Sequence, residues 1–433
     1  MISGLAGDRD NVNPASSANE PPGGRATIVA TGVLLQLCLG SIYAYGVLRT
    51  PLLDYFQGLG LNPSAMDMTW PFIVFLAIFA ITMPLAGPWI KKLGPAKVSM
   101  AGGVLCGLGW VAASFASSPL MLIPLYGVIG GIGVGIAYGA PIAASASWFP
   151  DKRGLAVGLT VLGFGLSSAI ITFATGFLMD GGWAIMDVLR LFGVAFIVLS
   201  ASLSLLLRFP GEGWQCPVPL VEGTCDGGGL MREEMLKTRT FKGLWISYTI
   251  GATAGLTAIG VAGPVGLEIF ANAGMSAEAA GALMFSLILP FALCNGLGRP
   301  LFGDLTDRLT PRNAAMLTFG LIILACLLIY GAYASIWAYI ISFALLWGSL
   351  GGWLAIAPAA TASYFGMRDN ARNYGVVFTA YGAGAIIGGI VSAQAKDIMG
   401  DFQTAFLILA ALAALGMIVA WKSMQAPDEA VGQ

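Results

Sequence analysis

The chain has 433 residues, of which 57% are hydrophobic and only 10% are charged. Soluble globular proteins carry roughly 25% charged residues, so this composition excludes a soluble chain. The formal net charge is −1 and histidine is absent, which excludes a basic nucleic-acid-binding surface and a histidine-based metal site. A transmembrane β-barrel would show alternating segments of about ten residues, whereas this chain has long apolar runs typical of membrane-spanning helices.

Uncharged apolar runs mark the expected spans in chain order. Each run is close to or above the roughly 20 residues that a helix needs to cross a bilayer. The runs cover 27–48, 70–90, 98–116, 120–147, 155–179 and 188–207 in the first half, and 243–267, 279–302, 314–332, 336–362, 375–395 and 403–421 in the second. We therefore predict an all-α polytopic membrane protein with twelve transmembrane helices in two six-helix bundles.

Three polar segments separate or flank these bundles. Residues 1–25 are rich in Pro, Gly, Asn and Ser and lack the apolar core of a signal peptide, so we interpret them as a disordered cytoplasmic tail. We expect residues 26–208 to form the N-terminal bundle and residues 243–422 to form the C-terminal bundle. The charged stretch 209–242 is predicted to be a cytoplasmic central loop, and 423–433 a cytoplasmic tail.

Lysine and arginine are distributed unevenly between the two ends of the expected helices. With a cytoplasmic N-terminus, most of them lie in cytoplasmic segments, whereas Arg49, Arg190 and Lys396 lie at the outer ends. Because cytoplasmic loops carry an excess of Lys and Arg, we predict that both termini are cytoplasmic. The spacing of the six cysteines matches no zinc or redox motif, and we expect free thiols, no metal and no cofactor.

The two halves of the chain are related to each other. The segment Gly87–Gly94 follows the second span, and the similar segment Gly303–Arg312 begins 216 residues later, after the eighth span. At the same offset, Ser-Trp-Phe at 147–149 corresponds to Ser-Tyr-Phe at 363–365. Since transporters often place their site between structural repeats, this repeat predicts two pseudo-symmetric bundles with a site between them.

The repeated segments resemble the loop of the major facilitator superfamily that reads Gly-x-x-x-Asp-Arg/Lys-x-Gly-x-Arg/Lys-Arg/Lys. Gly303, Asp307, Arg308 and Arg312 fit this pattern, whereas Lys91 stands where the first copy should have an acidic residue. Ala96 likewise replaces a basic residue. The resemblance implies a structural loop that ties helix ends together by Asp-to-Arg hydrogen bonds and helix-dipole contacts. Because the first copy departs from the pattern, we predict weaker contacts between helix ends in the N-terminal bundle.

A narrower resemblance lies in Trp-Phe-Pro-Asp-Lys-Arg-Gly at 148–154 and in Asn-Gly-x-Gly-Arg-Pro-x-x-Gly at 295–303. Both are similar to the oxalate/formate antiporter and monocarboxylate transporter branch, in particular to bacterial homologues of the proton-coupled lactate and pyruvate carriers. The resemblance implies secondary transport of a small monocarboxylate with a proton, in a bacterial cytoplasmic membrane. We expect a monomer whose partners are its substrate and membrane lipid.

Arg299 is the main candidate for substrate binding. A permanently charged guanidinium inside a membrane helix costs several kcal/mol unless it is paired or hydrated, and no acidic residue lies in the middle of any expected span. A substrate carboxylate fits as the missing counter-ion because its two oxygens match the two parallel donors of the guanidinium. The alternatives are that Arg299 extends to the cytoplasmic interface or pairs with Asp304.

Asn295 precedes Arg299 by four residues, so both side chains project from one face of the helix. This amide is expected either to orient the guanidinium or to donate to a substrate hydroxyl. Alternatively, it bonds a neighbouring helix, as asparagine often does in membranes.

Aromatic residues complete the predicted site. Tyr43, Tyr138 and Tyr381 lie on helices expected to face the cavity, where a phenol offers a hydrogen bond and an apolar ring, although each is also a candidate for simple packing. Phe164 matches an aromatic position of the family's pocket and is expected to receive a methyl group. Relatives that carry oxalate resemble Thr-Ala-Lys-Gly around position 381, where this chain has tyrosine. A single cation predicts a substrate with one carboxylate.

We predict alternating-access transport of monocarboxylates such as L-lactate or pyruvate, and we do not expect an enzyme because a nucleophile–base pair is missing. A passive anion channel, a sensor and an oxalate/formate-type exchanger are the alternatives. Arginine does not release a proton, so symport requires the proton to travel on the substrate or on a peripheral group such as Asp304.

Overall fold

The computed structural model describes residues 24–64, 67–68, 70–211, 214, 216, 229–399 and 402–426. The predicted N-terminal tail up to residue 23, much of the predicted central loop and residues 427–433 lie outside the described residues.

Twelve helices in the described part of the chain are long and apolar enough to cross a membrane. In the N-terminal half they are α2 (Ala26–Leu39, continued by the 3-10 turn η3, Gly40–Ala44), α4 (Trp70–Leu93), α5 (Pro95–Ala113), the run α6–η4–α7–α8 (Pro119–Leu122, Ile123–Val128, Ile129–Ala137, Gly139–Trp148), α9 (Arg153–Asp180) and α10 (Ile185–Ser204). In the C-terminal half they are α12 (Arg239–Asn272), α13 (Ala277–Leu309), α14 (Pro311–Gly331), α15 (Ile336–Phe365), α16 (Asn370–Met399) and α17 (Gln403–Ser423). Each predicted span overlaps one of these helices, which confirms the twelve-span fold.

Several helices extend beyond their apolar runs. The helix α3 (Tyr45–Gly58) continues the first span well past its predicted end at residue 48. The helices α12 and α13 also begin before the apolar residues, because Thr238 and Ser276 accept hydrogen bonds from the first-turn amides of Phe241 and Ala279. Polar capping residues of this kind set the helix ends, whereas hydropathy marks only the part suited to lipid.

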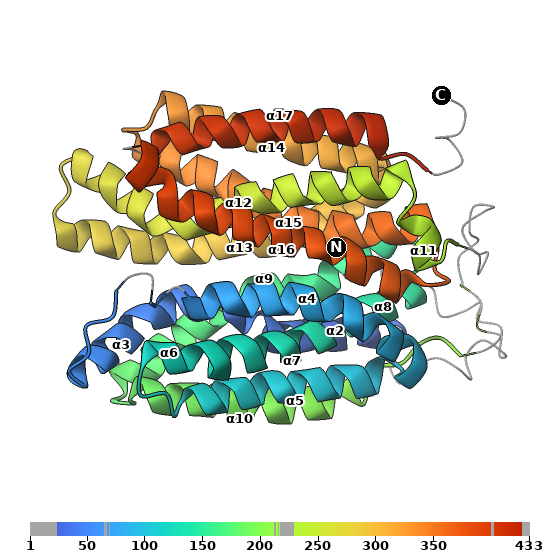
Figure 1. Ribbon diagram of the computed structural model, residues 1–433, viewed down its shortest axis with the longest axis horizontal. Coiled ribbons are helices and arrows are strands. Elements are labelled where there is room, and N and C mark those ends of the chain that lie inside the picture. The colour runs from blue at the N-terminus through green and yellow to red at the C-terminus, as the bar shows by residue number, and fades with distance from the viewer. Residues whose placement is uncertain are drawn as a thin grey trace.

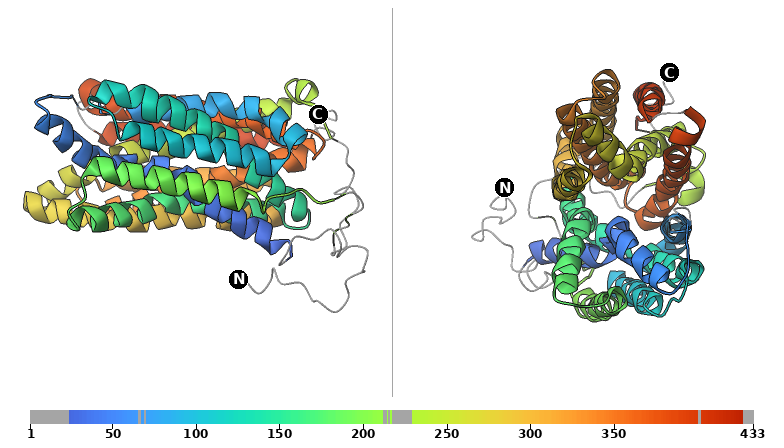
Figure 2. Two further views of the ribbon diagram at one scale, coloured as in Figure 1. Left: turned by 90° about the horizontal axis from the view of Figure 1, so that it is seen from below. Right: turned by 90° about the vertical axis from the view of Figure 1, so that its left-hand side faces the viewer.

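The helices form two bundles that lie side by side along the long axis of the molecule (Figure 1). Viewed along that axis, the bundle of residues 26–204 and the bundle of residues 239–423 are separate groups with one long interface (Figure 2). We call the end where α11 (Arg232–Met235) precedes α12 the connector end. The opposite end carries α3 and the turn between α12 and α13.

Close backbone approaches join the two bundles near the connector end. The helix α9 packs along α13, and α4 packs along α16. A methyl group on Gly158 would lie 2.8 Å from Pro300 Cα, and one on Gly87 would lie 2.8 Å from Arg372 Cα. Real side chains do not fit at such distances, so these glycines allow the bundles to close on each other at this end.

Two polar contacts reinforce this closure, and they are related by the internal repeat. Asp307 of α13 accepts hydrogen bonds from the backbone amides of Gly154 (2.8 Å) and Leu155 (2.9 Å), in the first turn of α9. This is the predicted helix-dipole contact. Lys91, 216 residues before Asp307, donates to Arg368 O at 3.1 Å and lies 3.9 Å from the buried Asp369 carboxylate. We expected a weaker connection between helix ends in the first copy, because Lys91 stands where an acidic residue is expected. The contact with Asp369, an acidic residue of the C-terminal half, compensates for that missing acid.

Candidate functional site

Arg299 lies on α13 at the interface between the two bundles, and its side chain is fully buried. One terminal nitrogen donates to Val161 O of α9 at 2.6 Å, and the other donates to Asn295 Oδ1 at 3.0 Å. The Nε group has no hydrogen-bond partner among the described residues. A methyl group on Gly165 would lie 3.0 Å from Nε, so the glycine of α9 leaves the space that the guanidinium occupies.

Both alternative interpretations of Arg299 are wrong. The guanidinium does not extend to the interface, because it is 0% exposed. Asp304 pairs with Arg308 on the same helix at 2.8 Å, and Asp307 is bonded to the start of α9. Within the described residues, no carboxylate forms an ion pair with Arg299. The protein thus holds a buried positive charge that a bound anion would neutralise.

Asn295 makes two of its predicted contacts, one to a neighbouring helix and one to Arg299. Its amide nitrogen donates to Trp347 O of α15 at 3.0 Å, and its carbonyl oxygen accepts from Arg299. The bond to the neighbouring helix fixes the amide, and the fixed amide in turn orients the guanidinium. Asn295 is therefore a positioning residue for Arg299.

The predicted aromatic residues gather around the guanidinium. The Phe164 ring centre lies 5.5 Å from Arg299 Cζ, within range of a cation–π contact. Tyr43 and Tyr138 each pack edge-on against Phe164, with ring centres 5.2 Å apart. The hydroxyl groups of Tyr43 and Tyr381 are hydrogen-bonded to each other. Since Tyr43 belongs to the N-terminal bundle and Tyr381 to α16, this bond joins the two bundles beside Arg299.

The structure therefore brings Arg299, Asn295, Tyr43, Tyr138, Tyr381 and Phe164 into one cluster, which we call the arginine site. Asp304, the weaker candidate for proton coupling, is not part of it. The Asp304 side chain is 32% exposed, and its carboxylate forms an ion pair with Arg308 near the connector end of α13.

Four aromatic residues of this cluster were missed by sequence reasoning. The ring centre of Phe378 lies 5.1 Å from that of Tyr138, and the ring centre of Phe79 on α4 lies 4.8 Å from that of Phe378. Tyr248 of α12 stacks on Trp353 of α15 with ring centres 5.8 Å apart, and its ring centre lies 6.3 Å from that of Tyr381. All four are buried within otherwise apolar runs. Phe378 was detectable in principle, since it precedes Tyr381 by three residues and shares its helix face.

The side chains of the arginine site have the chemistry that binding a small anion between aromatic walls would need. It contains one fixed positive charge, phenol groups that donate or accept hydrogen bonds, and rings that favour a short apolar group. An Nε donor remains available on the guanidinium. Such a set suits a small molecule with one carboxylate at one end and an alkyl group at the other.

Comparison with known proteins identifies the family. The model of the Major Facilitator Superfamily matches residues 37–256 and 244–432, which together span nearly all of the described helices. The chain belongs to the Major Facilitator Superfamily. As a member of this superfamily it is a secondary transporter with twelve spans, an integral membrane protein and not an enzyme.

Individual relatives place this superfamily member in the predicted branch. It is 29% identical over 409 residues to the oxalate:formate antiporter of Oxalobacter formigenes, with 90% of this chain and 91% of the relative covered. It is 26% identical over 421 residues to monocarboxylate transporter 11 of Mus musculus, covering 93% and 88% of the two chains. The predicted resemblance to oxalate/formate antiporters and monocarboxylate transporters is confirmed.

Solved structures support the fold. The proton:xylose symporter XylE aligns with a TM-score of 0.73 at 13% identity, covering 96% of this chain and 100% of that protein. At this level of identity the likeness concerns the arrangement of helices alone.

Proposed function

We propose that the protein transports small monocarboxylates such as L-lactate or pyruvate, with Arg299 as the carboxylate-binding residue. The observation that carries the proposal is the fully buried guanidinium without an acidic partner among the described residues. A carboxylate would supply the missing charge and accept from the donors that Val161 and Asn295 leave available. The aromatic rings of the arginine site would cover its alkyl end.

The single positively charged side chain of the arginine site favours a substrate with one carboxylate group over a substrate with two. Arg299 is accompanied in its cluster by phenol and phenyl rings, and Tyr381 contributes a hydroxyl group where a lysine would add a second charge. The similarity to the antiporter of Oxalobacter formigenes favours a second candidate, anion exchange of the oxalate/formate type. Exchange also needs no titrating side chain at the site.

We propose that transport proceeds by alternating access between bundles 26–208 and 243–422, joined by the central loop 209–242. The closed connector end would open while the opposite end closes around the bound acid. The Tyr43–Tyr381 bond joins the bundles beside Arg299 and would change in this step. We further propose a monomer in the lipid of a bacterial cytoplasmic membrane, with the connector end and both termini in the cytoplasm.

Reversing the charge of Lys91 is expected to reduce the initial rate of lactate uptake about twofold to fivefold, the effect of losing an exposed ion pair worth up to about 1 kcal/mol. Lys91 is 58% exposed, whereas its partner Asp369 is 1% exposed, so Lys91→Glu places a second carboxylate against a buried one. Lys91→Met should have the smaller effect, because it removes attraction without adding repulsion. Uptake into proteoliposomes measures both.

The matched control is Lys92→Glu, which makes the same change in charge on the exposed neighbouring residue. This control should transport at the wild-type rate. Equal losses in Lys91→Glu and Lys92→Glu would show that general surface charge, rather than the contact with Asp369, causes the effect.

Proton-coupled uptake of lactate is expected to be driven by a pH gradient across the membrane and to be insensitive to membrane voltage. The arginine site contains no Asp, Glu or His among its described residues, so we infer that a proton enters with the substrate anion. Anion and proton together carry no net charge, whereas moving one full charge through 100 mV would be worth about 2.3 kcal/mol. The test compares lactate uptake into proteoliposomes under an inside-alkaline gradient with uptake under a valinomycin-set potential at equal pH.

Accumulation driven by voltage alone would contradict electroneutral symport. Acceleration that depends on a preloaded internal anion, with no response to ΔpH, would instead establish the exchanger.

A further inference from the structure

Three tyrosine side chains lie buried together at the interface between the bundles. Tyr138 belongs to the fourth span, Tyr248 to α12 and Tyr374 to α16, and these residues are 0%, 0% and 3% exposed. Their rings surround Phe378, with ring centres 5.1, 6.4 and 5.9 Å from that of Phe378. We call Tyr138, Tyr248 and Tyr374 the tyrosine cluster.

The hydroxyl groups of the tyrosine cluster have no hydrogen-bond partner among the described residues. They lie within electrostatic range of one another, and those of Tyr138 and Tyr374 also lie within range of the charge on Arg299. A hydroxyl group that is buried without a partner loses its hydration and gains no bond in return, so three together are costly. The cluster therefore needs a polar occupant that the described residues do not supply.

Phe164 connects the tyrosine cluster to the arginine site. Its ring centre lies 5.5 Å from Arg299 Cζ and 5.2 Å from the ring centre of Tyr138. The guanidinium and the Tyr138 ring are thus both in contact with one aromatic ring, and a small acid can span their separation with a hydrogen bond at each end. At the arginine end, the unpartnered Nε of Arg299 is available to the carboxylate.

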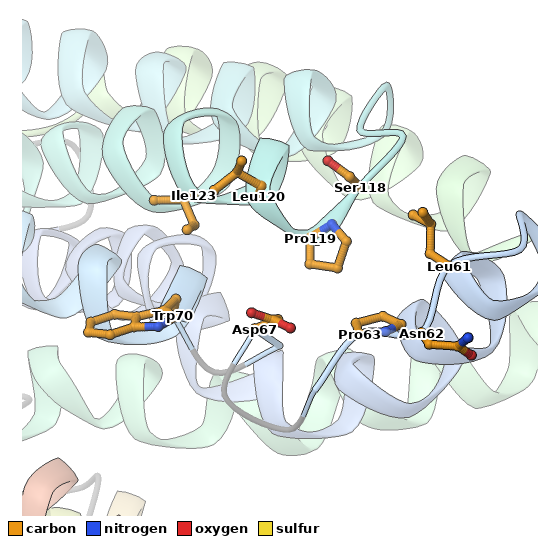
Figure 3. A pocket seen from close by; sticks show the side chains of 9 residues that line it. All are labelled: Leu61, Asn62, Pro63, Asp67, Trp70, Ser118, Pro119, Leu120 and Ile123. Atoms are coloured by element: carbon orange, nitrogen blue, oxygen red, sulfur yellow. The ribbon is translucent and has the colours of Figure 1, made fainter.

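A pocket of about 500 Å³ at the opposite end of the N-terminal bundle lacks such a group (Figure 3). It lies between the segment that joins α3 to α4 and the start of α6, and its charged lining residue is Asp67. The Asp67 carboxylate accepts hydrogen bonds from the amide and the hydroxyl of Ser64, within its own turn. The charge of this pocket therefore does not require a ligand, in contrast to the buried hydroxyl groups of the tyrosine cluster.

We propose that the tyrosine cluster binds a hydroxyl or carbonyl oxygen on the carbon chain of the substrate, so that the protein selects hydroxy and oxo acids over plain alkyl acids. This inference rests on the proposed function, since it requires Arg299 to hold the carboxylate. A phenol donates to a carbonyl oxygen, and it can donate to a hydroxyl group or accept from one, whereas an alkyl chain leaves all three phenols unpartnered. A site built to hydrogen-bond a polar group strongly rejects the analogue that lacks this group.

The test compares two pairs of acids that differ only in this oxygen: L-lactate with propionate, and β-hydroxybutyrate with butyrate. Each unlabelled acid competes with radiolabelled L-lactate for uptake into proteoliposomes that contain the full chain. The wild-type protein should prefer the oxygen-bearing member of at least one pair by about tenfold or more. This preference should fall about threefold to tenfold in Tyr248→Phe and in Tyr374→Phe, as for the loss of one hydrogen bond.

Tyr126→Phe is the matched control, because it removes a buried hydroxyl group outside the tyrosine cluster. Tyr126 is 2% exposed, and its hydroxyl group also has no partner among the described residues. It packs against Tyr45 and Trp110 within the N-terminal bundle. Its replacement should leave the preference between the paired acids unchanged.

Three results would overturn the inference while the proposed transport stands. One is equal inhibition by both members of each pair, which would show that the three hydroxyl groups hold only water. Another is a wild-type preference that survives in both Tyr248→Phe and Tyr374→Phe, and the third is an equal loss of preference in Tyr126→Phe. Absence of saturable L-lactate uptake by the wild-type protein would instead overturn the proposed function, and this inference with it.

Discussion

Arg299→Lys is expected to lose at least about nine-tenths of carboxylate uptake while the protein remains folded, because an ammonium cannot reproduce the planar guanidinium. Two of the guanidinium nitrogens already bond Val161 O and Asn295 Oδ1, and this arrangement fixes the direction of the remaining donors. A lysine at this position has three donors on a single atom and cannot satisfy both partners while presenting two parallel donors to a carboxylate. Radiolabelled L-lactate uptake into proteoliposomes at equal protein content measures the loss.

Arg308→Lys is the matched control, since it makes the same substitution on the same helix. Arg308 is 72% exposed and pairs with Asp304 outside the arginine site, so its replacement should leave uptake near the wild-type rate. Circular dichroism and elution on size-exclusion chromatography report whether each variant is folded. A folded Arg299→Lys protein that transports at the wild-type rate would contradict the binding role of Arg299.

Tyr381→Lys is expected to change substrate preference from lactate toward a dicarboxylate such as oxalate by about tenfold or more. Tyr381 is fully buried and bonded to Tyr43, so a lysine here would place a second cation in the arginine site. Two cations at an effective dielectric of about 20 repel by on the order of a few kcal/mol, and a monocarboxylate neutralises one of them. A dicarboxylate neutralises both. Competition of unlabelled oxalate and lactate against labelled substrate gives the preference.

Tyr381→Phe serves as the control, because it removes the hydroxyl and keeps the ring. Its rate of transport should change through the lost bond to Tyr43, while its preference for lactate over oxalate stays that of the wild type. If Tyr381→Lys transports with wild-type selectivity, residue 381 does not contact the substrate.

The spans and the central arginine were predictable because lipid imposes strong constraints on sequence. Apolar runs of membrane length locate the helices, and a charge inside such a run is costly enough to single out Arg299. The i, i+4 spacing then identifies Asn295. The extension of α3 was not visible, because Arg49 and Asp54 end the apolar run while the helix continues to Gly58.

The rest of the arginine site depends on tertiary packing. Phe378 is fully buried in the site, whereas Phe285 is 57% exposed on the outer surface, and both stand in similar apolar runs. Hydropathy does not distinguish a ring that faces lipid from a ring that faces another helix. The contact between Lys91 and Asp369 joins residues far apart in sequence, and a local motif does not reveal the acid that compensates for the lysine.

In the proposed alternating-access cycle, the hydrogen bonds of Asp307 to the start of α9 bear on how easily the two bundles part at the connector end. When the bundles part at the connector end, water can replace both partners, because the carboxylate and the two amides lie near a helix terminus. Because both bonds are accepted by a carboxylate, each exchanged bond then costs about 1.5–3 kcal/mol net, or about 3–6 kcal/mol for the pair. A difference of that size favours the closed connector end by on the order of 100-fold to 10,000-fold. A substrate reverses this preference only if it binds the open state more tightly by a comparable factor.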